Sequence, residues 1–282
     1  LKDAFREFLN KRLERDRLVR IYYNAGHMYE LYEDIPNALK MYEAAGDTDS
    51  ILRMLVVNAR QNPANGHYFE LRRYYLMLPE EAVCSHPDLI AGMSMLQSML
   101  MNGEESERWY HLLEKFAAEH SGSAKKEAKN RLLYLDIALP HRGTVHMVSL
   151  LKHAGSLLKS GKAMLPEFSV TSNLPSMMNG GKDFCEWSKR DLALSSSVGK
   201  IVEFVLGKYG KGLVSIALAE SFFEKGMDNY EIVSLAEKGR LQAEAGGKME
   251  LIFVAVGILV WLSVLNVHVD DAQDILDSFL YN

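Results

Sequence analysis

Cysteine and proline are both scarce in this chain. Among 282 residues there are 2 cysteines, Cys84 and Cys185, and 7 prolines. Two cysteines allow at most one disulfide and cannot form a cysteine-rich zinc site at this separation. We therefore expect two reduced thiols and a cytoplasmic protein. The prolines fall between periodic segments, where they separate helices.

An excess of positive charge is also lacking. Lys and Arg number 32 and Asp and Glu number 37, which gives a net charge of -5. Binding to DNA or RNA depends on clustered basic side chains that release counterions from phosphates. The densest basic run, KKEAKNR at 125–131, contains a glutamate and is typical of the solvated face of a helix. We expect no direct binding to nucleic acid.

Long apolar runs are rare, and the one that exists is short for a membrane span. Residues 251–267, LIFVAVGILVWLSVLNV, lie between Glu250 and Asp270. A span needs about 20 apolar residues, so a helix buried in protein explains the run better, and we expect no membrane association. The first residues, LKDAFREFLNKRLERD, are charged and amphipathic, unlike a signal peptide. They begin without methionine, so we expect the chain to be a piece of a longer protein.

Helical periodicity dominates the sequence, and no window shows the period-two alternation of a sheet. The fold class we expect is all-α, a superhelical stack of antiparallel helix hairpins. Residues 1–16, 17–160, 161–188 and 189–282 should form, in order, an end segment, N-terminal helical repeats, a long irregular loop and C-terminal repeats. Helices are expected at 2–15, 17–33, 35–46, 48–61, 65–77, 87–102, 104–119, 122–138, 144–160, 189–207, 211–226, 229–245, 248–266 and 270–280.

The spacing of small and aromatic residues indicates tetratricopeptide-like repeats, in which small residues lie where two helices cross and aromatic residues fill the gap to the neighbour. The clearest copy is made of Gly26, Tyr29, Ala38, Tyr42 and Ala45. A degraded copy contains Ala219, Phe222 and Ala236, together with Ile232, Leu235 and Gly239. A weaker third consists of Val260, Ala272, Leu276 and Phe279. Stacked hairpins of this kind build a curved solenoid with an extended concave face.

Catalytic and metal-binding patterns are not found, so we predict neither catalytic residues nor a metal site. Asp270, Asp271 and Asp274 have the spacing of the magnesium-binding aspartates of all-helical prenyl-diphosphate enzymes, but too few residues follow for the second motif. The stretch GSLLKSGK at 155–162 fails as a phosphate loop because Ala163 replaces the hydroxyl residue. The histidines show no metalloprotease spacing, and nothing marks a base for Cys185.

The long loop at 161–188 is the best remaining candidate for a binding site, because loops of this length in compact domains tend to be functional. Its end offers charge, amide and aromatic groups around two glycines. The candidate ligand contacts are Asn179, Lys182, Asp183, Trp187 and Arg190. The alternative is a structural clip, in which Phe184 and Trp187 fill the joint between two helical lobes.

Three stretches resemble the central helical region of the large ATP-dependent LuxR-type transcriptional activators, the group that includes the maltose-regulon activator. Residues 5–16, FREFLNKRLERD, are similar to the last helix of that family's winged-helix arm. Residues 25–47 look like its first sensor hairpin, and residues 211–251 are similar to its late repeats. The loop NLPSMMNGGKDFCEWSKRD is similar to one in clostridial members.

This resemblance implies a sensor that passes a signal to an ATPase switch and a DNA-binding domain outside this chain. The partner would be a small-molecule inducer or a regulatory protein, and self-association is a further expectation. No cofactor is expected here, since the chain has no Walker motif and ATP would bind only the missing upstream domain. The alternative is a tetratricopeptide adaptor that binds proteins or peptides. A third hypothesis, an all-helical enzyme that acts on prenyl diphosphates, is supported only by Asp270, Asp271 and Asp274.

Overall fold

The computed structural model describes residues 14–61, 68–142, 170–171 and 189–281, and within these ranges it is all-helical, without a strand. The N-terminal helices are α2 (Arg15–Leu31), α3 (Ile35–Ala45), α4 (Thr48–Gln61), α5 (Tyr68–Met77), α6 (Glu80–Cys84), α7 (Pro87–Met99), α8 (Gly103–Glu119) and α9 (Gly122–Ala138), followed by the short 3-10 helix η1 (Pro140–Arg142). The C-terminal helices are α12 (Asp191–Leu206), η2 (Gly207–Tyr209), α13 (Leu213–Glu224), α14 (Asn229–Glu244), α15 (Met249–Leu265) and α16 (Val269–Tyr281).

The helices follow the periodicity of the sequence closely. The expected helices at 48–61 and 122–138 match α4 and α9 residue for residue, and most other ends differ by three residues or fewer. The short helix α6 was not expected, because five residues between Pro79 and Pro87 are too few to show a helical period. The helix expected at 144–160, residues 2–13 of the first one, and nearly all of the 161–188 loop lie outside the described residues.

Side-chain caps explain where several helices begin. The Asp34 carboxylate accepts a hydrogen bond from the Asn37 backbone N–H at 3.3 Å, and α3 ends at Gly46, whose φ is 73°. The Asp228 carboxylate accepts from the backbone N–H groups of Tyr230 and Glu231 at 3.0 and 3.2 Å. Caps satisfy backbone groups that a helix end leaves unpaired, and the left-handed C-terminal glycine turns the chain back. Local sequence therefore fixes these hairpin turns.

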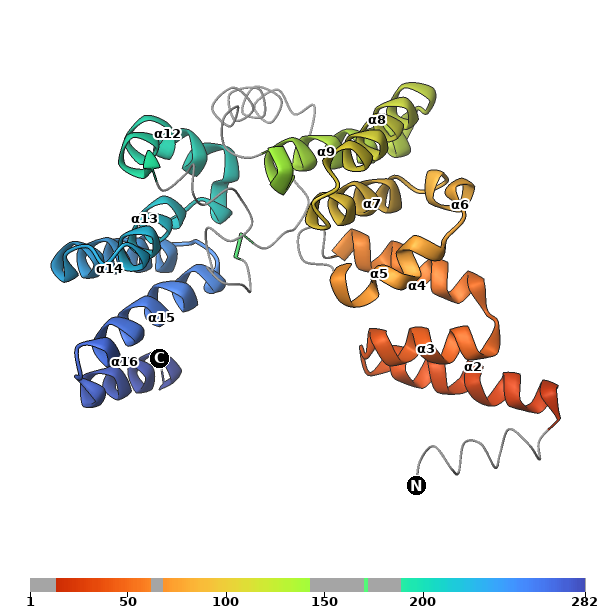
Figure 1. The fold of residues 1–282 in the computed structure, drawn as a ribbon, viewed down its shortest axis with the longest axis horizontal. Helices are drawn as coiled ribbons and strands as arrows, with labels where there is room; N and C mark the ends of the chain where they lie inside the picture. Colours follow the sequence, from red (N-terminus) through yellow and green to blue (C-terminus); the bar gives the residue numbers. More distant parts are fainter. Residues whose placement is uncertain (1–13, 62–67, 143–169, 172–188, 282) are drawn as a thin grey trace.

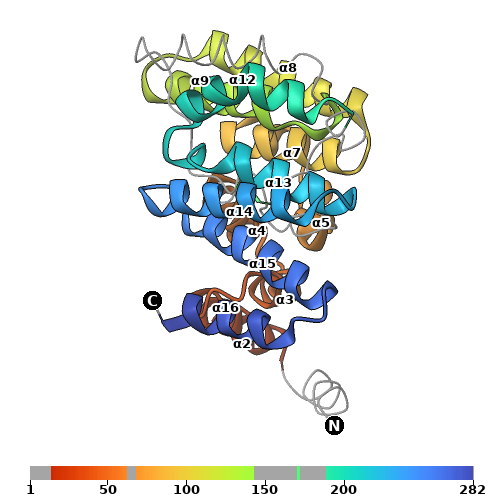
Figure 2. The ribbon, with the colours of Figure 1, turned by 90° about the vertical axis from the view of Figure 1, so that its left-hand side faces the viewer.

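Successive helices pack against one another in chain order. Contacts join α2 to α3, α3 to α4, α7 to α8, α8 to α9, and each helix from α12 to α16 to the next. In Figure 1 the helices form two arms that diverge from the region of α9 and α12. Figure 2 shows the same arms one behind the other, with α2 and α16 both at the end opposite α9 and α12. The helices α2 and α16 are thus the outermost elements of the two arms.

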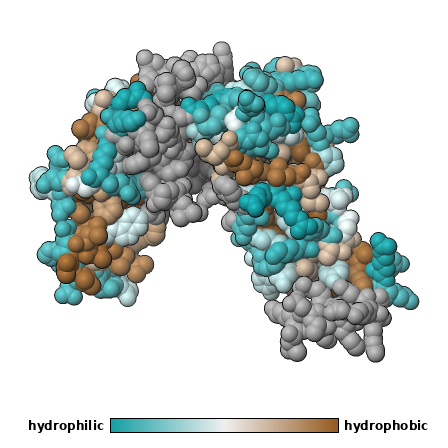
Figure 3. Space-filling model, in the orientation of Figure 1, coloured by the Kyte–Doolittle hydropathy of each residue, from teal (hydrophilic) through white to brown (hydrophobic). Residues whose placement is uncertain are grey.

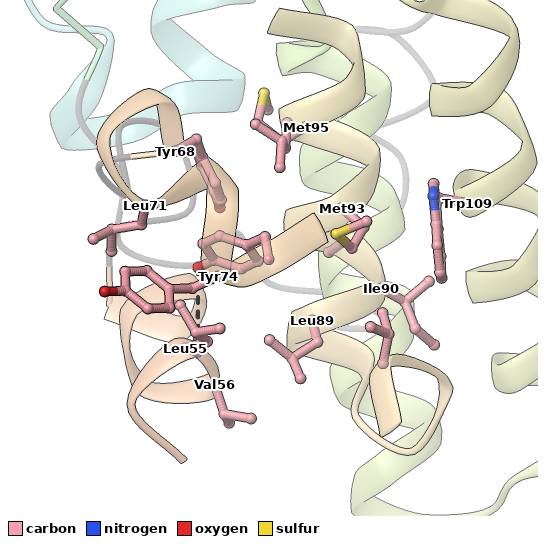
Figure 4. Packing of buried hydrophobic residues seen from close by; sticks show 14 of the residues in the cluster. Leu55, Val56, Tyr68, Leu71, Tyr74, Leu89, Ile90, Met93, Met95 and Trp109 are labelled. Atoms are coloured by element: carbon pink, nitrogen blue, oxygen red, sulfur yellow. Dashed lines mark hydrogen bonds between the residues drawn. The ribbon is translucent and has the colours of Figure 1, made fainter. Parts of the chain in front are cut away.

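Each arm has its own hydrophobic core. The N-terminal core surrounds α7, which is buried along most of its length, and it includes Leu39, Leu55, Tyr75, Leu96 and Leu113. Figure 4 shows how side chains from α4, α5, α7 and α8 interlock there. The C-terminal core is built on α13 and α15. A third, small cluster joins Leu133 of α9 to Val202, Val205, Leu206 and Tyr209.

The apolar run near the C-terminus forms α15, as expected for a helix that packs against protein. Leu251, Val254, Ala255 and Ile258 are fully buried against neighbouring helices. The same helix also exposes large apolar side chains, which are Phe253, Trp261, Val264 and Leu265. No helix within the described ranges is both long enough and apolar enough to cross a membrane.

Candidate functional site

Of the five predicted ligand contacts, only Arg190 lies among the described residues. It is exposed and precedes the first turn of α12. Asn179, Lys182, Asp183 and Trp187 lie outside the described residues.

The residue next to Arg190 ties the start of α12 to the end of α13. The buried carboxylate of Asp191 accepts a hydrogen bond from the Ser221 hydroxyl at 2.7 Å and forms an ion pair with Lys225. Burial acts to raise the pKa of Asp191, but the hydrogen bonds from Lys225 and Ser221 outweigh burial and lower it. Arg190 is therefore presented from a firmly anchored helix end.

The small and aromatic residues of the first predicted repeat lie mostly where two helices cross. Gly26 is buried against the ring of Tyr42, and a Cβ atom on Gly26 would lie 2.9 Å from two ring carbons. Ala38 is fully buried and Ala45 is half-buried. Tyr29 differs from the prediction, because it is 39% exposed. Its helix, α2, is the outermost of its arm, and no described helix covers that side.

A group of three polar side chains, here called the polar node, links the crossing of α2 and α3 to α4. The Tyr42 hydroxyl donates to Glu30 Oε2 at 2.7 Å, and Arg53 Nη2 donates to the same oxygen at 2.8 Å. The Arg53 guanidinium is the main cause that lowers the pKa of Glu30 to about 2. Burial, aided by Glu30, raises the pKa of Tyr42 to about 12. The node links α2, α3 and α4, so it has a structural role.

Replacing Gly26 with valine should destabilise this crossing. Because the hydroxyl of Tyr42 is held by Glu30, its ring cannot move aside freely, and we expect a loss of about 2–3 kcal/mol in the free energy of unfolding. Urea denaturation followed by circular dichroism measures this loss. In the background of Tyr42→Leu the penalty of Gly26→Val should shrink, and an undiminished penalty would show that the contact with Tyr42 is not its cause.

The second predicted repeat is also buried at its small positions. Ala219 and Ala236 are fully buried and Phe222 is nearly so. The closest approach, however, joins Gly212, which precedes α13, to Gly239 of α14. A Cβ atom on either glycine would overlap the other helix far inside van der Waals contact. In the third copy Ala272 is buried but Leu276 is exposed on α16, the outermost helix of its arm.

One polar cluster resembles a serine–histidine–acid triad in its distances. Ser98 Oγ lies 2.8 Å from His141 Nδ1, and His141 Nε2 lies 2.8 Å from Glu107 Oε1. In a catalytic triad the serine faces the substrate. Here Ser98 is fully buried inside α7, and the acid is the most exposed member. The order of exposure is therefore reversed, and the geometry gives no support to nucleophilic catalysis.

The same cluster instead anchors η1 to α8 and α9. Arg142 donates to both carboxylate oxygens of Glu107 at 2.7 Å and to Asp136 Oδ1 at 2.9 Å. The Tyr110 hydroxyl also donates to Asp136 Oδ1, at 2.7 Å, and the guanidinium of Arg142 lies over the Tyr110 ring. A bidentate arginine–carboxylate pair is both strong and geometrically specific. This anchor fixes the last described residues before the long segment that joins the two arms.

The anchor should make stability depend on acidity. Arg142, followed by His141, lowers the pKa of Glu107 from 4.5 to about 2. A carboxyl group whose pKa is lowered on folding stabilises the fold above pH 4.5, and this contribution is lost as the pH falls to about 2. Because Glu107 is partly exposed, we expect Glu107→Gln to cost only about 1–2 kcal/mol at neutral pH. Urea titrations from pH 7 to pH 2 should show the two proteins converging in stability, and a constant difference would contradict this origin.

A buried ion pair that the sequence analysis missed lies among α4, α7 and α9. Arg131 Nη2 lies 2.6 Å from Asp88 Oδ1, and both side chains are almost fully buried. Arg60 Nη2 reaches Asp88 Oδ2 at 2.9 Å from the surface side. The basic run 125–131 was predicted to be a solvated helix face, and this is wrong for the buried Ala128 and Arg131, whereas Lys126 and Lys129 are exposed. No single-sequence signal distinguishes Arg131, because its partner is 43 residues away in the chain.

Metal-binding clusters are absent from the described ranges, in which no group of three or more His, Cys, Asp or Glu side chains could hold an ion. Asp270, Asp271 and Asp274 are exposed on α16 and face no second acidic group there. Cys84 is half-buried, and burial raises the pKa of its thiol, which makes it a poor nucleophile. Cys185 lies outside the described residues.

The described residues therefore present packing nodes, a buried ion pair and the exposed Arg190, with no group of side chains among them that could hold a metal ion. Fold class alone says little about function, since one architecture serves many activities. Comparison of the chain with protein-family models, with curated proteins and with solved structures gives no match in any of the three.

Proposed function

We propose that this chain is a signal-sensing region of a LuxR-type transcriptional regulator, which binds a small-molecule inducer or a regulatory protein. The signal would pass to an ATPase switch and a DNA-binding domain elsewhere in the regulator. The proposal includes a tetratricopeptide-like superhelix as the framework of the two arms. It is supported by the pairing of helices in chain order and by the burial of Gly26, Ala38, Tyr42, Ala219 and Ala236 at helix crossings.

The sensing role rests on one observation. The buried cluster that joins the two arms is small among the described residues. Among the described residues, the N-terminal and C-terminal cores each extend over several helices, whereas the cluster that joins α9 to α12 and η2 has five buried side chains, Leu133, Val202, Val205, Leu206 and Tyr209. Stabilisation by burial scales with the apolar area removed from water, so this cluster of described residues contributes less than either core. A change in the angle between the arms is therefore the conformational change that a ligand can bias most easily.

A ligand drives such a change only if it binds one arrangement of the arms more tightly than the other. A molecule that contacts both arms meets this requirement, because its contacts depend on their angle. Arg190 offers one such contact, since it stands one turn before Leu194, which packs against the cluster that joins the arms, whereas the buried α12 residues of that cluster lie toward the other end of the helix. The other four predicted contacts, Asn179, Lys182, Asp183 and Trp187, complete the proposed inducer site.

Thermal denaturation of the full chain against sugars, amines and aromatic metabolites tests the proposal. A true inducer present at 100 times its dissociation constant should stabilise the chain by about 2.7 kcal/mol and raise its melting temperature. Arg190→Ala and Trp187→Ala should abolish this rise, while the exposed control Arg72→Ala should leave it intact. A compound that binds with unchanged affinity to both loop variants would place the site elsewhere, and no response to any compound or regulator would contradict the sensing role.

A tetratricopeptide-type adaptor is the second candidate, and the exposed apolar side chains of α15 favour it. Phe253, Trp261, Val264 and Leu265 are all exposed there. Figure 3 shows apolar surface gathered on the arm that contains α15 and α16. Exposed apolar patches commonly mark sites of protein contact. An adaptor should lose its partner on Phe253→Asp and keep it on Arg190→Ala, which is the opposite of the pattern expected for the inducer site.

A further inference from the structure

The outermost helix of the N-terminal arm carries an apolar stripe that no described helix covers. Leu18, Ile21, Ala25, Met28 and Tyr32 follow one another at alternating steps of three and four residues. This spacing places them along one side of α2 and is the spacing of a helix that packs against another helix. Ile21, Met28 and Tyr32 are exposed, the last by 77%, and the other two are half-buried.

The outermost helix of the C-terminal arm has a second such stripe. Ala272, Ile275 and Phe279 of α16 pack toward α15 and the core. The adjacent side exposes Val269, Leu276 and Leu280, again at helical spacing. Both arms therefore end in an apolar helix face that lacks a described partner.

The two helices that carry these stripes lie at corresponding places in the fold. Figures 1 and 2 show that the arms diverge from α9 and α12 and that both free ends, α2 and α16, lie on the same side of the molecule. Two copies turned toward each other about a two-fold axis can therefore meet at both ends at once. In such a dimer all four end helices have a partner. The arrangement is closed, as in most homo-oligomers.

Charge decides which ends meet. The first half of α2 exposes Arg15, Arg17 and Arg20 beside a single acid, Asp16, and is therefore net positive. On α16, Asp270, Asp271 and Asp274 are exposed, and the helix contains no Lys or Arg. A two-fold axis that paired α2 with α2 and α16 with α16 would bring like charges together. The alternative axis pairs α2 with α16 of the other copy, twice, and brings opposite charges together.

We propose that two copies of this chain form a closed dimer in which α2 of each copy packs against α16 of the other. The apolar stripes supply the contact area, and the arginines and aspartates set its register and direction. A stable interface buries about 800 Å² per partner, so each of the two contacts needs to supply only about 400 Å². The inference depends on the two end faces alone and holds whether or not the chain senses an inducer.

Sedimentation velocity of the full chain between about 1 and 100 µM tests this proposal. We expect a dimer that weakens as sodium chloride is raised, because salt screens the attraction between the basic half of α2 and the acidic α16. Reversing the α2 charges (R15E, R17E, R20E) or the α16 charges (D270K, D271K, D274K) should raise the dissociation constant at least tenfold. The single reversal Arg72→Glu on α5 controls for net charge and should change nothing.

The combined variant is decisive. A chain that carries both sets of reversals again pairs opposite charges, so it should dimerise within about threefold of the unaltered protein. Under pairing of like helices, either single set would leave the repulsion unchanged. A chain that stays monomeric at 100 µM overturns the proposal, as does a dimer that is indifferent to the α16 reversals or not restored in the combined variant. Circular dichroism of every variant identifies any loss caused by unfolding.

Discussion

Replacing Gly212 with alanine is expected to be among the most damaging single-methyl changes in this chain, with a loss of about 3–5 kcal/mol in the free energy of unfolding. Gly212 has a φ of 82°, in the left-handed region, which costs a residue with a Cβ atom roughly 1–2 kcal/mol. The new Cβ atom would also overlap the carbonyl oxygen of Gly239 and lie 3.3 Å from the backbone nitrogen of Ala243. Because these neighbours are backbone atoms, no side-chain rotation relieves the clash, and α13 and α14 must separate.

Hydrogen exchange measured by mass spectrometry can localise this effect. Protection should fall in α13 and α14 and remain in α7 and α8, since the two arms have separate cores. Gly239→Ala should cost less, because its nearest backbone neighbours lie 3.1 Å from the new Cβ atom, whereas at Gly212 the nearest backbone oxygen lies at 2.3 Å. Gly257→Ala on α15 is the matched control. No atom lies within 4 Å of its new Cβ, so it should stabilise the chain by about 0.5–1 kcal/mol. Equal effects at the three positions would contradict the role assigned to the crossing.

The two glycines also show what could be predicted from the sequence. Helix positions follow from local periodicity and caps, so α4 and α9 were located to the residue. Gly239 belonged to a predicted repeat, but its close approach to Gly212 joins residues 27 positions apart and has no local signal. Burial at the helix crossings was predicted correctly for Ala38 and Ala236. Tyr29 is exposed instead, because an aromatic side chain is buried only where a neighbouring helix packs against it. Spacing predicts which side of a helix is apolar but not what packs against it.

The same limit applies to the candidate site. Catalytic motifs are recognised by spacing in sequence, whereas the distances among Ser98, His141 and Glu107 arise only when three elements meet. Their chemistry depends on exposure, which sequence spacing does not report. Exposure also separates Arg131 from the lysines beside it, although all belong to one basic run. Tertiary packing, rather than residue type, therefore decides which polar groups are solvated.

Removal of the Asp88 carboxylate should show how much that packing contributes. Asp88→Ala leaves the Arg131 guanidinium charged and only 4% exposed, while its Nη1 atom already lacks a hydrogen-bond partner among the described residues. Breaking a buried ion pair by removing one member typically costs about 3–5 kcal/mol, because the remaining charge is uncompensated. Asp88 also lies in the first turn of α7, where the helix dipole favours an acidic residue. We expect a loss in this range in urea denaturation at pH 7.

Arg60→Ala provides the matched comparison, because Arg60 contacts the same carboxylate with a side chain that is 56% exposed. Its removal should cost at most about 1 kcal/mol, as is usual for surface pairs. The double variant Asp88→Leu with Arg131→Met replaces both charges with apolar groups and should recover most of the loss of Asp88→Ala. A double-mutant cycle would then give a large coupling energy between Asp88 and Arg131. If Asp88→Ala cost no more than Arg60→Ala, the charge of Arg131 would be reaching solvent, and α4, α7 and α9 would be packed less tightly than their burial indicates.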